Sequence, residues 1–79
     1  MPEYEKIIEI LDEYVRVDEI KPNDNFKFDL DMSSFELIGF AGDVKETFGV
    51  QLTVEDFLNN PTVIEMAQHI LTETRRKNK

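Results

Sequence analysis

Residues 33–49 read SSFELIGFAGDVKETFG and largely decide the fold that we expect. Ser33 and Glu36 stand three positions apart before an apolar run, which is the spacing of a capping box at a helix start. Gly49 interrupts the pattern, as glycine commonly does just past a helix end. We therefore predict a helix over 34–48. Its expected inward stripe is Phe35, Ile38, Ala41, Val44 and Phe48, flanked by Leu37 and Phe40.

Three other segments are predicted to be helical. Residues 3–16 place apolar residues at helical spacing with acids between them. A short helical turn is expected over 53–58, capped by Thr53. Residues 62–65 read TVIE, a second capping box that opens a last helix to about residue 74. The expected inward residues of these last two segments are Phe57, Leu58, Val63, Ile64, Met66, Ala67, Ile70 and Leu71.

The connection over 17–33 is long and rich in turn-forming residues around Pro22. We expect its apolar side chains to pin it to the core: Ile20, Phe26, Phe28 and Leu30. The predicted fold class is all-α: a four-helix bundle of three longer helices and one short helix, with a long loop between the first and second helices. We expect a single domain over 1–79, with a flexible basic tail at 75–79.

The charge is strongly acidic and uneven along the chain. The net charge is −8, while residues 1–74 hold all seventeen acids and only five bases, a net of −12. Such a body repels nucleic acid and anionic lipid, so we expect neither nucleic-acid nor membrane binding. It attracts partners that carry basic patches. The alternative is that the acidity only maintains solubility.

The residues that the sequence lacks exclude several kinds of site. With no cysteine, the chain has no disulfide, zinc–thiolate site or cysteine nucleophile. The one histidine, His69, is expected at a helix boundary and not in a metal cluster or a catalytic triad. The acids over 24–36 do not fit a calcium loop in either register. No membrane span or signal core is evident, so we expect a cytoplasmic protein. Because the catalytic and metal-binding patterns above are missing, we also expect that it is not an enzyme and binds no metal. We expect a monomer.

Three motifs resemble those of acyl carrier proteins. Residues 29–35, DLDMSSF, resemble the family signature Asp-Leu-Gly-x-Asp-Ser-Leu, with Asp31 at the usual glycine and Ser33 at the usual aspartate. FGVQL at 48–52 resembles the Phe-Gly-Val-x-Ile that ends the second helix of the family. NPTV at 60–63 resembles the opening of the fourth helix in many carrier domains. The resemblance covers most of the chain.

The resemblance implies that Ser34 carries 4′-phosphopantetheine through a phosphodiester. The terminal thiol of that arm would hold acyl groups as thioesters. The resemblance also implies an acyl pocket, for which we expect Ile38, Phe57 and Ile64 as lining. The implied partners are a phosphopantetheinyl transferase and enzymes that transfer, activate or modify acyl groups in fatty acid or related biosynthesis.

Carrier proteins dock their partners on the second helix, so the resemblance implies a partner face there. The expected partner-binding residues are Phe35, Glu36, Gly39, Gly42, Lys45 and Glu46. The two glycines and the lysine make this face less acidic than is usual, so a carrier dedicated to a peptide, polyketide or cell-wall pathway is one alternative. Phe35 is a candidate for the core as well as for this face. An unmodified helical interaction domain anchored by Phe35 and Phe40 is an alternative of a different class.

Overall fold

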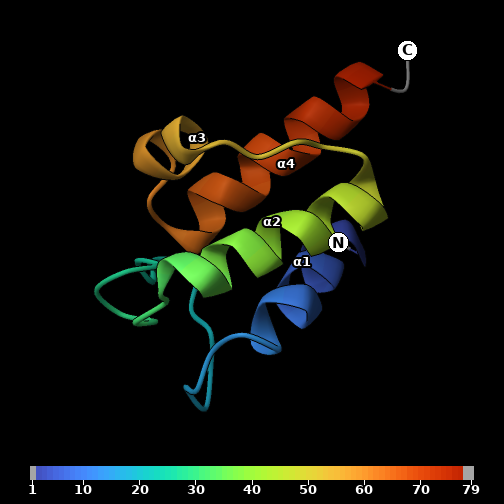
Figure 1. The fold of residues 1–79 in the computed structure, drawn as a ribbon. Helices are drawn as coiled ribbons and strands as arrows, with labels where there is room; N and C mark the ends of the chain where they lie inside the picture. Colours follow the sequence, from blue (N-terminus) through green and yellow to red (C-terminus); the bar gives the residue numbers. More distant parts are fainter. Residues whose placement is uncertain (1, 78–79) are drawn as a thin grey trace.

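The computed structural model describes residues 2–77, which fold into four helices (Figure 1). They are α1 (Pro2–Asp12), α2 (Ser34–Phe48), α3 (Val54–Asn59) and α4 (Val63–Lys77). This arrangement confirms the all-α fold of three longer helices and a short one, with a long loop after the first. Of the tail that is expected to be flexible, residues 75–77 form the last turn of α4, and residues 78–79 lie outside the described part.

The core lies where α1, α2 and α4 meet the long loop. The rings of Phe26, Phe40 and Phe57 cluster there, with centroids 5.7–6.3 Å apart, and join the loop, α2 and α3. Within residues 2–77, fifteen buried apolar residues form the core: Ile7, Ile10, Leu11, Phe26, Leu30, Met32, Phe40, Val44, Val50, Leu52, Val63, Met66, Ala67, Ile70 and Leu71. Burial of these side chains is the main stabilising contribution to a fold of this size.

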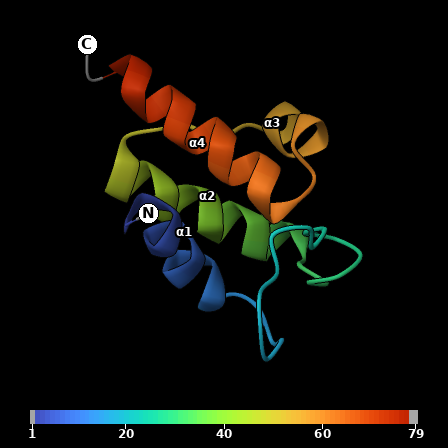
Figure 2. The ribbon, with the colours of Figure 1, turned by 180° about the vertical axis from the view of Figure 1, so that it is seen from behind.

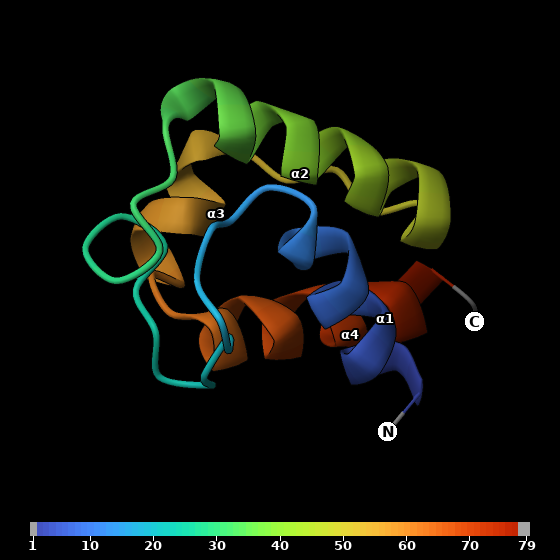
Figure 3. The same cartoon turned by 90° about the horizontal axis from the view of Figure 1, so that it is seen from below.

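Backbone hydrogen bonds fasten the long loop to the start of α4. Pro22 O accepts from Ile64 N at 2.8 Å, Asp24 O accepts from Val63 N at 2.9 Å, and Phe26 N donates to Pro61 O at 3.1 Å. Figure 2 shows the loop beside the first turn of α4. Figure 3 shows it passing from α1 to the start of α2. The loop is therefore held at the end of the bundle where α2 begins.

The first helix ends at Asp12 and not at residue 16 as expected. The chain turns away because Tyr14 packs its ring on α2 and donates its hydroxyl to Asp43 Oδ2 at 2.5 Å. Arg16 continues along α2 and pairs with Glu36 at 3.1 Å. Tertiary contacts with α2 thus override a helical pattern that would have continued through Val15.

The expected inward stripe of α2 is wrong for two residues. Phe35 and Ile38 are 87% and 70% exposed, whereas Phe40 and Val44 are fully buried. The helix is rotated so that Phe40 meets the phenyl rings of the loop and of α3. Two further residues expected to lie inward are exposed, Phe28 of the loop and Leu58 of α3.

Candidate functional site

Ser33 closes the start of α2 with the expected capping box. Its hydroxyl accepts from Glu36 N at 3.2 Å, and its own N–H donates to Glu36 Oε1 at 2.8 Å. That backbone hydrogen bond is the main reason why the pKa of Glu36 is lowered from its usual value, and Arg16 contributes to the same effect. Because Ser33 and Glu36 cap the helix, the side chain of Ser34 has no capping role.

Ser34 occupies the first position of α2 and is exposed. N–H groups in the first turn of a helix point outward and have no partners within the helix, which makes this end favourable for an anion. The structure therefore places an accessible hydroxyl beside a region that accommodates a phosphate. This environment fits a phosphodiester on Ser34.

The loop residue Asp31 has a left-handed backbone, with φ of 52°. This conformation favours glycine, and aspartate is one of the few other residues that tolerate it. Asp31 stands where the acyl carrier signature has glycine, so the chain keeps a glycine-like turn without the glycine. The turn brings Met32 into the core just before Ser33 caps α2.

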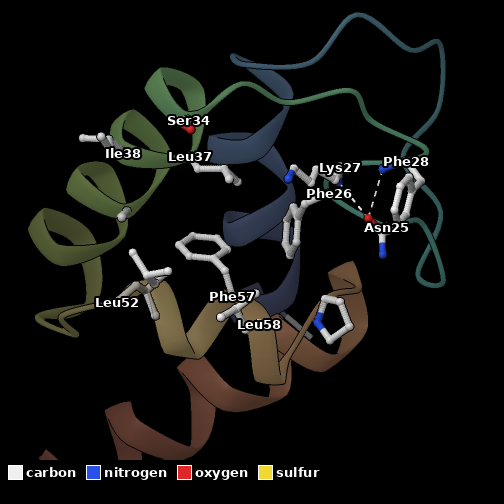
Figure 4. A pocket seen from close by; sticks show the side chains of 13 residues that line it. Asn25, Phe26, Lys27, Phe28, Ser34, Leu37, Ile38, Leu52, Phe57 and Leu58 are labelled. Carbon is white, nitrogen blue, oxygen red and sulfur yellow. Dashed lines mark hydrogen bonds between the residues drawn. The ribbon is translucent and has the colours of Figure 1, made fainter.

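An apolar cavity of about 470 Å³ opens beside Ser34, between α2, α3 and the long loop (Figure 4). Its lining from the two helices and Leu52 consists of Ser34, Leu37, Ile38, Ala41, Leu52, Val54, Phe57 and Leu58. The long loop contributes Asn25, Phe26, Lys27 and Phe28, and Pro61 comes from the connection between α3 and α4. The volume lies within the range of small-ligand pockets.

Of the three expected lining residues, Ile38 and Phe57 lie on the cavity and Ile64 does not. Ile64 lies in the first turn of α4, where its backbone N–H donates to Pro22 O. Sequence reasoning missed the loop side of the cavity altogether. It also missed Leu37 and Ala41, although Ser34, Leu37, Ile38 and Ala41 follow the spacing of one helical face.

The residues expected to form the partner face divide into two groups. Phe35, Gly42, Lys45 and Glu46 are exposed on α2. Glu36 is engaged with Ser33 and Arg16, and Gly39 lies under Tyr14, where a Cβ would stand 2.6 Å from Tyr14 Cε1. Gly39 is therefore a close-packing position within the fold, contrary to the expectation that it lies on the outward face.

The family model described as "Phosphopantetheine attachment site" matches residues 5–70. The chain belongs to this family. Its members are carriers to which 4′-phosphopantetheine is covalently attached, and they leave catalysis to other proteins. The acyl carrier assignment, the covalent cofactor and the non-enzymatic role expected from the sequence are thereby confirmed.

The fold of this carrier is also that of a solved acyl carrier protein. The chain superposes with a TM-score of 0.78 on a type-II acyl-carrier-protein from Streptomyces verticillus involved in bleomycin biosynthesis. The two are 24% identical, and the match covers 91% of this chain and 86% of that one. Comparison with curated protein sequences finds no match. Within residues 2–77, no helix is long and apolar enough to cross a membrane.

Proposed function

We propose that Ser34 is the phosphopantetheine attachment residue of this carrier. The observation that carries the proposal is that two neighbouring serines have different roles at the start of α2. Ser33 caps the helix, while the neighbouring hydroxyl of Ser34 is exposed at the edge of an apolar cavity. When bound, the cofactor supplies a terminal thiol that holds an acyl group as a thioester. The chain itself supplies an anchor, a helix start that accommodates phosphate, and an apolar surface for the cargo.

Intact mass measurement tests the attachment residue. The chain is incubated with coenzyme A and a phosphopantetheinyl transferase, and we expect the addition of one phosphopantetheinyl group to the wild type. Ser34→Ala should add none while keeping a helical circular dichroism spectrum, and Ser33→Ala should still be modified. A modified peptide that contains the group on Ser33 would refute the assignment.

We further propose that the carrier serves a dedicated set of acyl-handling enzymes and substitutes poorly in a general fatty acid synthase. Two acids of α2 are engaged inside the fold, Glu36 by Arg16 and Asp43 by Tyr14. The exposed face then presents Phe35, Gly42 and Lys45, which offer few partners to a basic docking patch. An exposed ion pair contributes only about 0.2–1 kcal/mol, so several such differences are needed to lower affinity about tenfold, or about 1.4 kcal/mol.

Kinetics with a generic malonyl transferase test this second proposal. The rate on this carrier should be lower than on a fatty acid carrier, and Lys45→Glu should raise it by restoring an acid on the exposed face. Glu46→Gln is the matched control and should lower the rate. Equal rates for the two wild-type carriers would contradict a dedicated partner set.

A further inference from the structure

Among the described residues that line the cavity beside Ser34, Lys27 is the one with a charged side chain. The other lining residues are apolar, apart from Asn25 and Ser34. An apolar cavity favours the hydrocarbon part of a cargo, but an unpaired carboxylate within it would be strongly disfavoured. A cationic group at the mouth changes this balance, because it pairs with an anion while the hydrocarbon part stays inside.

Two acids close to Lys27 in the sequence accept hydrogen bonds from backbone N–H groups of the loop. Asp24 Oδ2 accepts from Lys21 N at 2.8 Å, and Asp29 Oδ2 accepts from Asn25 N at 2.7 Å. Among residues 2–77 two ion pairs are present, Arg16–Glu36 and Arg76–Glu73, and His69 contacts Asp56. Lys27 belongs to none of these contacts. Lys27 is therefore a cation without an ion-pair partner in a strongly acidic part of the chain.

The backbone of the loop holds Lys27 at the cavity. Asn25 Oδ1 accepts from Lys27 N at 2.8 Å and from Phe28 N at 3.0 Å, which fixes a tight turn. Figure 4 shows the Lys27 side chain extending from this turn toward Leu37 of α2, while Phe28 points away. A long lysine side chain in this position covers apolar surface with its methylene groups and keeps its ammonium in water.

We propose that Lys27 binds an anionic group at the mouth of the cavity. Given the proposed attachment at Ser34, that group is the free carboxylate of a dicarboxylic acyl cargo or the phosphodiester on Ser34 itself. Both anions belong to the loaded carrier, and both offer oxygen acceptors to an ammonium. For the cargo, the proposal adds a preference for acyl groups with an apolar segment and an anionic end.

Amide chemical shifts of the loaded carrier separate the two sources. The 15N-labelled chain is prepared as the apo form, the phosphopantetheinylated form, and forms loaded with pentanoyl or with its carboxylate analogue glutaryl. Lys27→Met keeps the apolar part of the side chain and removes the charge. Lys21→Met is the matched control, because Lys21 is exposed on the same loop but does not line the cavity.

We expect glutaryl to shift the amides of Phe28 and Leu37 more than pentanoyl does, in the wild type and in Lys21→Met. Lys27→Met should reduce that extra shift, because losing one exposed ion pair lowers the equilibrium constant for the tethered contact about 1.4- to 5-fold. If Lys27→Met already reduces the amide shift changes between the apo and phosphopantetheinylated forms, the anion is the phosphodiester. If Lys27→Met reduces the shift changes only in the glutaryl-loaded form, the anion is the cargo carboxylate.

Two results would overturn the inference, and they are distinguishable. Equal responses of Lys27→Met and Lys21→Met at every step, with intact mass showing full loading, would refute the role of Lys27 alone. Absence of any mass increase would refute the proposed attachment at Ser34 and, with it, the anion site.

Discussion

Two glycines in the middle of α2 should respond in opposite ways to the same substitution. Gly39 and Gly42 both lie inside a helix, where replacing glycine by alanine adds about 0.5–1 kcal/mol of stability. A Cβ built on Gly42 meets nothing within 4 Å. A Cβ built on Gly39 stands 2.6 Å from Tyr14 Cε1 and 3.1 Å from Tyr14 Cζ and Oη.

The contact at Gly39 sets the size of the difference. Tyr14 has to move to admit the methyl group, and it then loses its hydrogen bond to the Asp43 carboxylate. A hydrogen bond to a charged group contributes about 1.5–3 kcal/mol. When the gain of about 0.5–1 kcal/mol in helix propensity is subtracted from this loss, Gly39→Ala should be destabilised by about 0.5–2.5 kcal/mol. Gly42→Ala should be stabilised by up to about 1 kcal/mol.

Thermal and urea unfolding followed by circular dichroism measure this difference. For a chain of this size, 1 kcal/mol corresponds to a Tm change of about 4–8 °C. Gly42→Ala should therefore melt above the wild type and Gly39→Ala below it. In a Tyr14→Ala background the steric conflict is absent, so Gly39→Ala should become stabilising, a reversal that a double-mutant cycle detects. If Gly39→Ala stabilises the wild type as much as Gly42→Ala does, Tyr14 does not pack on α2 in the way described.

Other predictions concern the capping box, the tyrosine and the link between α3 and α4. Ser33→Ala should lower the free energy of unfolding by about 0.5–2 kcal/mol, since the Glu36 N–H loses its acceptor, and an unchanged melting temperature would contradict the cap. The hydrogen bond to Asp43 raises the pKa of Tyr14 from 10.0 to about 12. The folded-state pKa is the higher one, so the stability from this bond is complete below pH 10 and is lost as the pH rises toward 12. Between pH 10 and 12, the free energy of unfolding in urea should fall more steeply for the wild type than for Tyr14→Phe. The same pH dependence in both proteins would refute the contribution of the Tyr14 hydroxyl. His69 Nε2 lies 3.4 Å from Asp56 Oδ1 and links α4 to α3 beside the cavity. His69→Gln should therefore speed amide hydrogen exchange in α3 but not in α1. Unchanged exchange rates in α3 would show that this contact does not stabilise the helix.

The sequence by itself determined the helix boundaries that depend on neighbouring residues. The Ser33–Glu36 and Thr62–Glu65 capping boxes join residues three positions apart, so their hydrogen bonds require only the local helical conformation. Gly49 adopts φ of 72° and ends α2 for an equally local reason. The position of the exposed serine at the first turn of α2 follows from these local bonds.

Only the tertiary structure decided which side of each helix faces the core. In α2, apolar residues lie on more than one side of the helix, and phenyl rings from the distant loop and from α3 pack on the side that contains Phe40. The end of α1 depends likewise on Tyr14 reaching Asp43, 29 positions further along the chain. The loop side of the cavity, including Lys27, depends on backbone hydrogen bonds between the loop and the start of α4. Contacts of this kind join residues far apart in sequence, so helical periodicity, which records only the neighbours of each residue, does not predict them.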